Sequence, residues 1–173
     1  MSKNISQKRS RWKERGQSIV EISLITPLLL VALYIPVDFG ISFYVGNIVG
    51  NTAREGARIG SGLPKPGGTF GNAQANQIRD YVLGPPPKVP RWLTGRELLV
   101  SFYDGASCIQ FVEVTVRGNY NFFLYQIINL FGFNVPDSVL ISRTTRMRYN
   151  YQLAGGSTDT LCTTPTNFDP YSV

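Results

Sequence analysis

A long apolar run near the N-terminus constrains this chain more than any other feature. The run covers residues 22–44, and Asp38 is its one charged residue. As a helix it measures about 34 Å, which is long enough to span a bilayer. A secretory signal is the alternative interpretation, but its apolar region is only about 7–15 residues long and a small-residue cleavage site follows it. We therefore predict a membrane helix that the mature protein retains.

Basic residues crowd the segment before the apolar run. Residues 1–15 contain six Lys or Arg and a single Glu, which accounts for +5 of the net charge of +6. Because Lys and Arg collect on the cytoplasmic flank of membrane helices, we expect a cytoplasmic leader and an exported C-terminal part. The rest of the chain is nearly neutral, so we expect no nucleic-acid partner.

The composition excludes several kinds of active site. The chain has no His, which excludes His-based catalysis and His-ligated metals, and its two Cys cannot form a four-cysteine zinc site. The sequence also lacks a phosphate-binding loop and the common hydrolase motifs. Carboxylates distant in sequence can still converge, but we expect no enzyme activity, no cofactor, no metal and no small-molecule substrate.

The junction between leader and helix reads Arg15-Gly16-Gln17-Ser18-Ile19-Val20-Glu21. A basic leader, a Gly and a Glu at the start of an apolar helix resemble a prepilin peptidase site. The resemblance implies cleavage between Gly16 and Gln17 on the cytoplasmic side. It also implies that Glu21 pairs with the terminal amine of a neighbouring subunit, because a carboxylate near hydrocarbon needs a cationic partner.

A simpler interpretation of the junction remains open. Ser18 and Glu21 have the spacing of a capping box, and a Glu in the first turn favours the helix dipole. Capping would explain both residues without a peptidase, although it would not explain Gly16. The residue after Glu21 is Ile22, where pilins commonly have an aromatic residue.

The helical pattern continues beyond the predicted membrane span. Small residues recur at helical spacing along one edge and polar residues along the next. The small edge lets another backbone approach closely, either in the chain's own C-terminal domain or in another subunit. The small residues are Gly46, Gly50, Ala53, Ala57 and Gly60, and the polar ones are Asn47, Asn51, Arg54 and Arg58.

Asp38 lies at the expected outer edge of the bilayer, and two interpretations of it are open. It is either hydrated at the interface or paired with Arg54 or Arg58 of another chain.

Four elements together resemble the TadE-like family of minor pilins and pseudopilins in tight-adherence (Flp-type) pilus systems. They are the junction at residues 15–21, the apolar run, Val37-Asp38-Phe39-Gly40, and Asn51-Thr-Ala-Arg54-Glu55-Gly56-Ala57-Arg58. The resemblance implies a membrane component of a pilus apparatus. Its expected partners are membrane lipid, the prepilin peptidase and other pilin or pseudopilin subunits. A membrane-anchored binding or adhesion domain without cleavage or filament assembly is the alternative function.

The region after residue 60 indicates a small domain. A helix is expected over residues 72–83, capped by Asn72 and ended by Gly84, with Ala75, Ile78 and Val82 buried. Strands are expected over residues 97–103, 110–116 and 139–151, the first two as a hairpin around residues 104–107. Residues 121–133 are strongly apolar, and as a helix they place Phe123, Ile127, Leu130 and Phe131 on one face. This face packs either in the core or against a membrane or partner.

These expectations define an α+β, pilin-like fold. A cytoplasmic leader covers residues 1–16, and a transmembrane helix that extends outside the membrane covers residues 17–60. The exported domain, with a small antiparallel sheet, covers residues 61–173 and has a flexible tail from about residue 153. Cys108 and Cys162 are a possible disulfide in an oxidising compartment, with two free buried thiols as the alternative.

Overall fold

The computed structural model describes residues 5–64, 70–105, 108–130, 132, 134–150 and 161–172. Side chains are described within these ranges except at residues 5–17, 127, 130 and 169–172. The chain divides into two compact units, Met1–Gly40 and Ile41–Val173.

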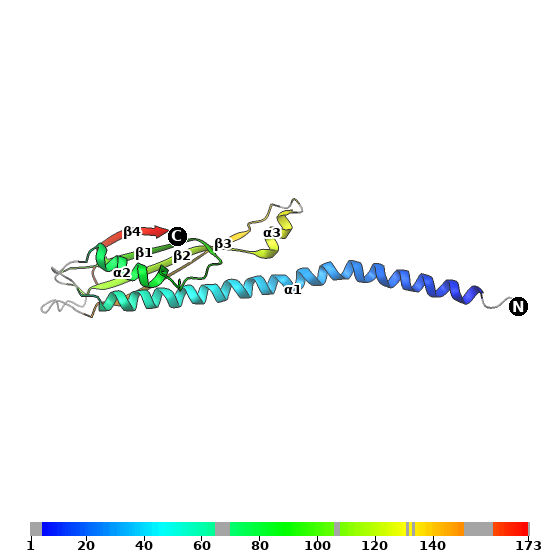
Figure 1. The fold of residues 1–173 in the computed structure, drawn as a ribbon, viewed down its shortest axis with the longest axis horizontal. Coiled ribbons are helices and arrows are strands. Elements are labelled where there is room, and N and C mark those ends of the chain that lie inside the picture. The colour runs from blue at the N-terminus through cyan, green and yellow to red at the C-terminus, as the bar shows by residue number, and fades with distance from the viewer. Residues whose placement is uncertain are drawn as a thin grey trace. The chain divides into compact units, whose positions relative to one another are not determined.

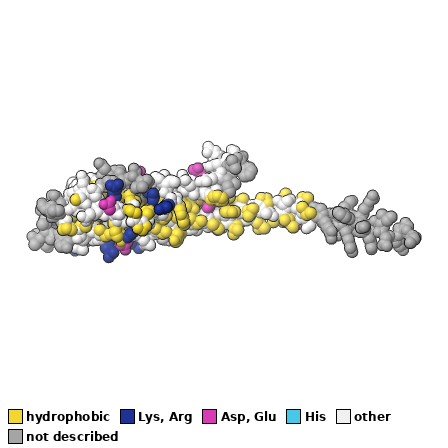
Figure 2. Space-filling view, in the orientation of Figure 1, with side chains coloured by type: hydrophobic (Ala, Val, Ile, Leu, Met, Phe, Trp, Pro, Cys, Tyr) yellow, Lys and Arg dark blue, Asp and Glu magenta, His cyan; other side chains and the backbone are white. Residues whose placement is uncertain are grey.

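The first unit consists of the N-terminal part of helix α1, which runs over Ile5–Gly62 and continues through Pro27 and Pro36 (Figure 1). From residue 19 its large apolar side chains are mostly exposed, and Figure 2 shows hydrophobic side chains along this part of the helix. Within the described residues, α1 is the one helix long and apolar enough to cross a membrane. Exposure of this long apolar surface to water is unfavourable, so the length and composition of the helix favour a lipid environment.

The second unit contains a four-stranded antiparallel sheet in the order β3-β2-β1-β4. The strands are β1 (Leu93–Tyr103), β2 (Phe111–Asn121), β3 (Ser138–Arg148) and β4 (Pro165–Ser172). Helix α2 covers Asn72–Leu83, and helix α3 covers Phe123–Leu130 between β2 and β3. The expected α+β fold, a long apolar helix followed by a small antiparallel sheet, is confirmed.

The core of the second unit lies between one face of the sheet and the helices α1 and α2. The predicted face of β2, with Val112, Val114 and Val116, is fully buried. It meets alternate residues of β1 on one side, because Phe102 pairs with Val112 and Val100 with Val114. The two helices contribute Val45, Val49, Ala53 and Ala57 from α1, and Ala75, Ile78 and Val82 from α2.

Helix α2 has the predicted bounds and buries the predicted residues Ala75, Ile78 and Val82, but its N-cap differs from the prediction. The cap is Gly71 instead of Asn72. The Gly71 N–H donates to Oε1 of Gln74 at 3.0 Å, which satisfies one of the free N–H groups of this turn. Gly84 ends the helix, as predicted.

The predicted hairpin forms, and both of its strands are longer than expected. Strand β1 begins at Leu93, four residues before the predicted start, and the pairing shifts register between Thr94 and Glu97. Gly95 has a φ of 56° at this irregularity. A bulge interrupts the period-two alternation, so the pattern alone did not reveal the first residues of the strand.

Strand β4 corrects the expectation of a loose tail. Residues 165–172 pair with β1, and Phe168, which faces Val100, is buried. The sequence did not predict this strand because it contains two prolines, Pro165 and Pro170. Proline is unfavourable in a central strand, where its missing N–H removes a hydrogen bond. They are compatible with β4 because it lies at the edge of the sheet. Residues 151–160 lie outside the described residues, as does Tyr151 at the end of the third predicted strand.

The apolar segment at residues 121–133 contains α3, and its side chains divide between the two expected environments. Phe122 and Leu124 are buried, whereas Phe123 is exposed. The predicted common face cannot be placed as a whole, because the side chains of Ile127 and Leu130 and the whole of Phe131 lie outside the described residues.

Candidate assembly surface on helix α1

The first unit carries the predicted processing site and the residue predicted to set subunit register. Gly16 and Gln17 lie within α1, and Glu21 is exposed on the same helix. Ser18 and Glu21 lie inside α1, which begins at Ile5. In a chain shortened at Gly16 the same two residues would lie in the first turn, so the capping interpretation also stays a prediction.

The hydroxyl groups of Ser23 and Thr26 in this segment are satisfied within the helix. Ser23 Oγ donates to the Val20 carbonyl at 2.8 Å, and Thr26 Oγ1 donates to the Ile22 carbonyl at 2.7 Å. These bonds let polar side chains lie in an apolar environment without an unpaired donor. Glu21 is the acidic residue next to them. Asp38 lies further along α1 in the same unit, and its suggested pairing with an arginine of another chain stays a prediction.

The stripe of small residues packs inside the chain. Ala53 and Ala57 are fully buried in the core of the second unit. A Cβ atom on Gly46 would lie 3.7 Å from Arg143, and one on Gly50 would lie 3.8 Å from the same side chain. The stripe therefore faces the chain's own sheet, which is the intramolecular alternative. Ala53 and Ala57 have no exposed surface within this chain, and the assembly role predicted for them stays a prediction.

The closest approach of α1 to the rest of the core occurs at two glycines. A Cβ atom on Gly56 would lie 3.2 Å from both Val82 and Val114. One on Gly60 would lie 2.8 Å from Ile78 and 3.1 Å from Val112. The stripe predicted from the sequence included Gly60 but left out Gly56. The signal for Gly56 was its spacing of four residues from Gly60 and from Thr52, which is also buried.

The polar edge of α1 faces away from the core. Asn47, Asn51, Arg54 and Arg58 are all exposed. Arg58 pairs with Glu55 at 3.1 Å, and the Tyr81 hydroxyl of α2 donates to the same carboxylate at 3.2 Å. The hydrogen bond and charge of Arg58 lower the pKa of Glu55 from its ordinary value of 4.5. Arg54 and Arg58 thus remain accessible to another chain, although Arg58 already has an intramolecular partner.

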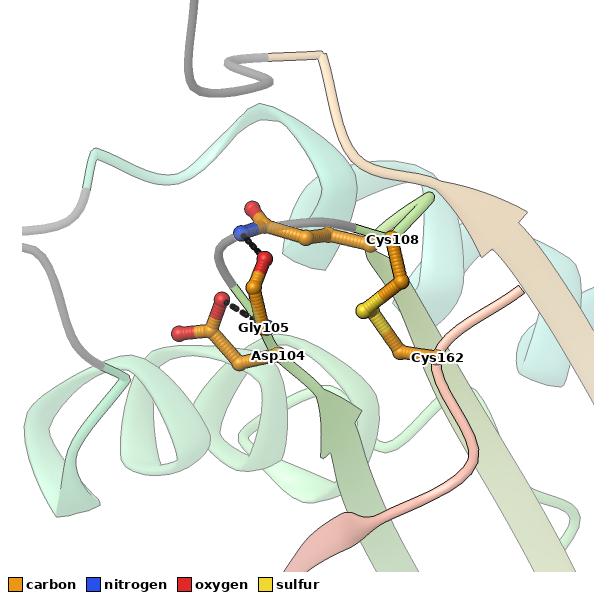
Figure 3. Close-up of a disulfide and its surroundings, with 5 residues drawn as sticks. Asp104, Gly105, Cys108 and Cys162 are labelled. Carbon is orange, nitrogen blue, oxygen red and sulfur yellow. Dashed lines mark hydrogen bonds between the residues drawn. A yellow bond between two sulfur atoms is a disulfide. The ribbon is translucent and has the colours of Figure 1, made fainter. Parts of the chain in front are cut away.

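A disulfide connects Cys108 with Cys162, with the two Cα atoms 5.0 Å apart (Figure 3). Hydrogen bonds order the chain around it. The Cys162 N–H donates to the Ile109 carbonyl at 3.2 Å, and the Gln110 side chain donates to the Gly105 carbonyl at 2.9 Å. The disulfide therefore fastens the segment that leads into β4 to the segment that leads into β2.

The face of the sheet opposite the helices carries ion pairs across neighbouring strands. Arg117 of β2 pairs with Glu97 of β1 at 2.5 Å, and Arg146 of β3 pairs with Glu113 of β2. Thr115 and Thr144 share a hydrogen bond of 2.8 Å between the same two strands. These pairs support the register of the sheet. No group of three or more His, Cys, Asp or Glu side chains suited to a metal was found among the described residues.

Comparison with known proteins gives a family match that falls on helix α1. No curated protein and no solved structure matches the chain. The matched segment starts at Gly16, includes Glu21 and Asp38, and ends with the polar edge at Arg58. Over these residues, 16–58, the chain matches the model of the family described as TadE-like protein.

Proposed function

We propose that this protein is a minor pilin or pseudopilin of a tight-adherence pilus apparatus. The observation that carries the proposal is the match of residues 16–58 to the TadE-like family. The matched segment combines the predicted cleavage site, an exposed apolar helix of membrane-spanning length and the polar edge that follows it. The family match supports a pilus-associated membrane protein, and the minor pilin role is our extension of it.

In this proposal the protein acts by assembly and has no catalytic role. The apolar part of α1 anchors the chain in the cytoplasmic membrane, with residues 1–16 on the cytoplasmic side and the second unit exported. The disulfide between Cys108 and Cys162 supports export, because disulfides persist in oxidising compartments. The protein is released from its leader by the prepilin peptidase and then enters the filament or its assembly platform.

Glu21 is the residue we assign to register. It is exposed at the start of the apolar run of α1, so within the membrane its carboxylate gains most from a cationic partner. The new terminal amine of Gln17 in an adjacent subunit supplies that charge. Because the small stripe is used inside the chain, contacts between subunits fall on the apolar surface before residue 41 and on the polar edge with Arg54 and Arg58.

Intact mass spectrometry of the protein extracted from membranes tests the processing step. We expect a species that lacks residues 1–16 and begins at Gln17. The Gly16→Val variant, in the same cells, should remain at full length because the bulky side chain blocks the scissile bond. A wild-type chain that stays at full length while its peptidase is active would favour the alternative, an uncleaved anchor for an exported binding domain.

A second experiment tests the role of Glu21. The variant Glu21→Gln keeps the size and the helix but removes the charge. We expect it to be processed and to remain in the membrane, yet to be lost from sheared pilus fractions or from crosslinks with other pilins. Normal incorporation of Glu21→Gln would contradict the proposed ion pair and leave the processing result unaffected.

A further inference from the structure

Three exposed aromatic side chains lie at one end of the second unit, and two of them are in contact. Phe43 and Tyr44 on α1 are 70% and 57% exposed, and Trp92, immediately before β1, is 58% exposed. The rings of Tyr44 and Trp92 lie in contact, with centroids 6.5 Å apart. Large aromatic side chains are usually buried in a soluble domain, so an exposed cluster at this place needs a partner.

The position of this cluster along the domain follows from the packing of α1 on the sheet. Gly46 faces Ile141 near the start of β3, whereas Gly60 faces Val112 near the start of β2. Trp92 precedes Leu93, which pairs with Tyr120 at the end of β2. The cluster therefore lies at the end of the sheet opposite Val112. This end adjoins Tyr44, the last residue of the predicted membrane span.

Helix α3 lies at the same end of the sheet. It follows β2 directly, and the Phe122 N–H before it donates to the Asp137 carbonyl at 2.8 Å. Figure 1 shows α3 beyond the ends of the strands. Phe123 on α3 is 54% exposed, and the sequence contains no charged residue between Arg117 and Asp137. The end of the domain next to the membrane span thus carries a second uncharged, aromatic element.

We propose that Phe43, Tyr44, Trp92 and Phe123 form a membrane-side surface that rests in the lipid headgroup region of the outer face of the bilayer. Tyr and Trp favour this region because their rings are apolar while their O–H and N–H groups remain hydrated. Arg91, exposed beside Trp92, is placed to reach lipid phosphates. The occupant is lipid because Tyr44 is continuous with the predicted span. This inference depends on the membrane anchoring proposed above.

The surface has a consequence for assembly. A domain that is joined to the bilayer only through its helix can tilt freely. A domain that also contacts lipid has one preferred orientation. The polar edge with Arg54 and Arg58 would then be held at a fixed height above the membrane for neighbouring subunits.

Fluorescence quenching in the full-length protein tests this inference. The chain has two tryptophans, so Trp12→Phe leaves Trp92 as the single reporter. The variant is reconstituted in phosphatidylcholine vesicles with or without bromine atoms near the top of the acyl chains. Because an interfacial residue sits about 5–10 Å into the headgroup and acyl boundary, we expect bromolipid to reduce Trp92 emission by about half.

The matched control moves the reporter to the other end of the domain. Leu161 is also 58% exposed, and it bridges Ile109 next to the disulfide, beyond the start of β2. In the variant Trp12→Phe, Trp92→Phe, Leu161→Trp, bromolipid should leave the emission unchanged. Flotation of each variant with vesicles reports anchoring separately.

The outcomes distinguish the membrane-side surface from the membrane anchoring on which it depends. Flotation with quenching at position 92 and none at position 161 supports the membrane-side surface. Flotation without quenching at position 92, or with equal quenching at both positions, overturns this inference and leaves the anchoring intact. Failure to float overturns the anchoring, and the inference with it.

Discussion

Gly60 of α1 lies so close to Ile78 of α2 that a Cβ atom on the glycine would stand 2.8 Å from Ile78 Cδ1. Val112 of β2 limits the space on the other side at 3.1 Å. Gly60 is therefore, with Gly56, a point at which the long helix, the short helix and the sheet meet. Real Cβ atoms do not sit this close to a neighbour, so any side chain at position 60 must displace part of the core.

The variant Gly60→Val should lower the free energy of unfolding by about 1–3 kcal/mol through overpacking. The matched control is Gly62→Val, two residues later in the same helix, where an added Cβ atom meets nothing within 4 Å. Both variants replace a glycine in the last turn of α1 with valine, so their difference reports mainly the close contact at position 60. Chemical unfolding followed by near-ultraviolet circular dichroism measures the difference in the free energy of unfolding between the two variants. Equal stability of the two variants would show that the core accommodates the extra methyl groups.

Removal of the disulfide should destabilise the second unit. The crosslink closes a loop with a sequence separation of 54, which in the chain-entropy model corresponds to about 4 kcal/mol. We expect the double variant Cys108→Ser, Cys162→Ser to unfold at a lower denaturant concentration than the wild type.

A reductant provides the control for this prediction. Dithiothreitol should lower the midpoint of the wild type to that of the double variant and leave the double variant unchanged. Identical midpoints for oxidised wild type and double variant would mean that the bond contributes nothing to stability.

Sequence analysis predicted the parts of the fold that carry a periodic signal. The alternating valines of β2 and the apolar spacing of α2 both specify which face is buried, because local periodicity matches the geometry of the element. The small residues Ala53 and Ala57 were also recognised as a close-packing edge. Their partner was not, because a stripe of small residues specifies a short distance between backbones and leaves open which backbone comes near.

The features that sequence analysis missed depend on distant contacts or irregular backbone. The start of β1 was not predicted because the bulge at Gly95 interrupts the alternating pattern. The edge strand β4 was not predicted because it contains prolines. The sequence did not indicate the contact of Trp92 with Tyr44, because the two residues come together only when the sheet packs on α1. Glu21 is a different case: its environment depends on lipid and other subunits, so the fold of one chain does not determine its role.

Phe168 is a buried aromatic side chain of β4, and its removal tests how far this side chain holds the strand on the sheet. The ring is 8% exposed and meets Phe102 of β1 edge-on, with centroids 5.5 Å apart. Phe168→Ala should lower the free energy of unfolding by about 3–5 kcal/mol, because truncation of a buried phenylalanine leaves a cavity. The neighbouring Asn167→Ala, at an exposed position, should change stability little.

Hydrogen exchange distinguishes a local effect of Phe168→Ala from a global one. We expect amides of β4 to lose protection first, while those of β2 keep it. Unchanged protection along β4 would indicate that backbone pairing and the disulfide suffice to hold the strand.

Glu55 predicts a defined pH dependence of stability. The Arg58 guanidinium donates a hydrogen bond to Glu55 and holds the pKa of that carboxyl below its ordinary value of 4.5. In the pH range between the folded and unfolded pKa values, the unfolded chain therefore binds more protons than the folded one. The resulting stabilisation is complete above pH 4.5 and is lost as the pH falls through the folded pKa of Glu55. Because both side chains are substantially exposed, the effect should be small and should weaken in high salt.

Thermal unfolding of wild type and Glu55→Gln across pH measures this effect. The wild type should have the higher melting temperature near neutral pH, and the difference should shrink as the pH falls below 4.5. In an Arg58→Gln background the same substitution should make a smaller difference, because the main cause of the lowered pKa is absent. Tyr81→Phe should have a weaker influence, since its hydroxyl is a lesser cause of the shift. A difference between wild type and Glu55→Gln that stays constant from neutral pH to about pH 3 would place the effect in side-chain packing instead of the ion pair.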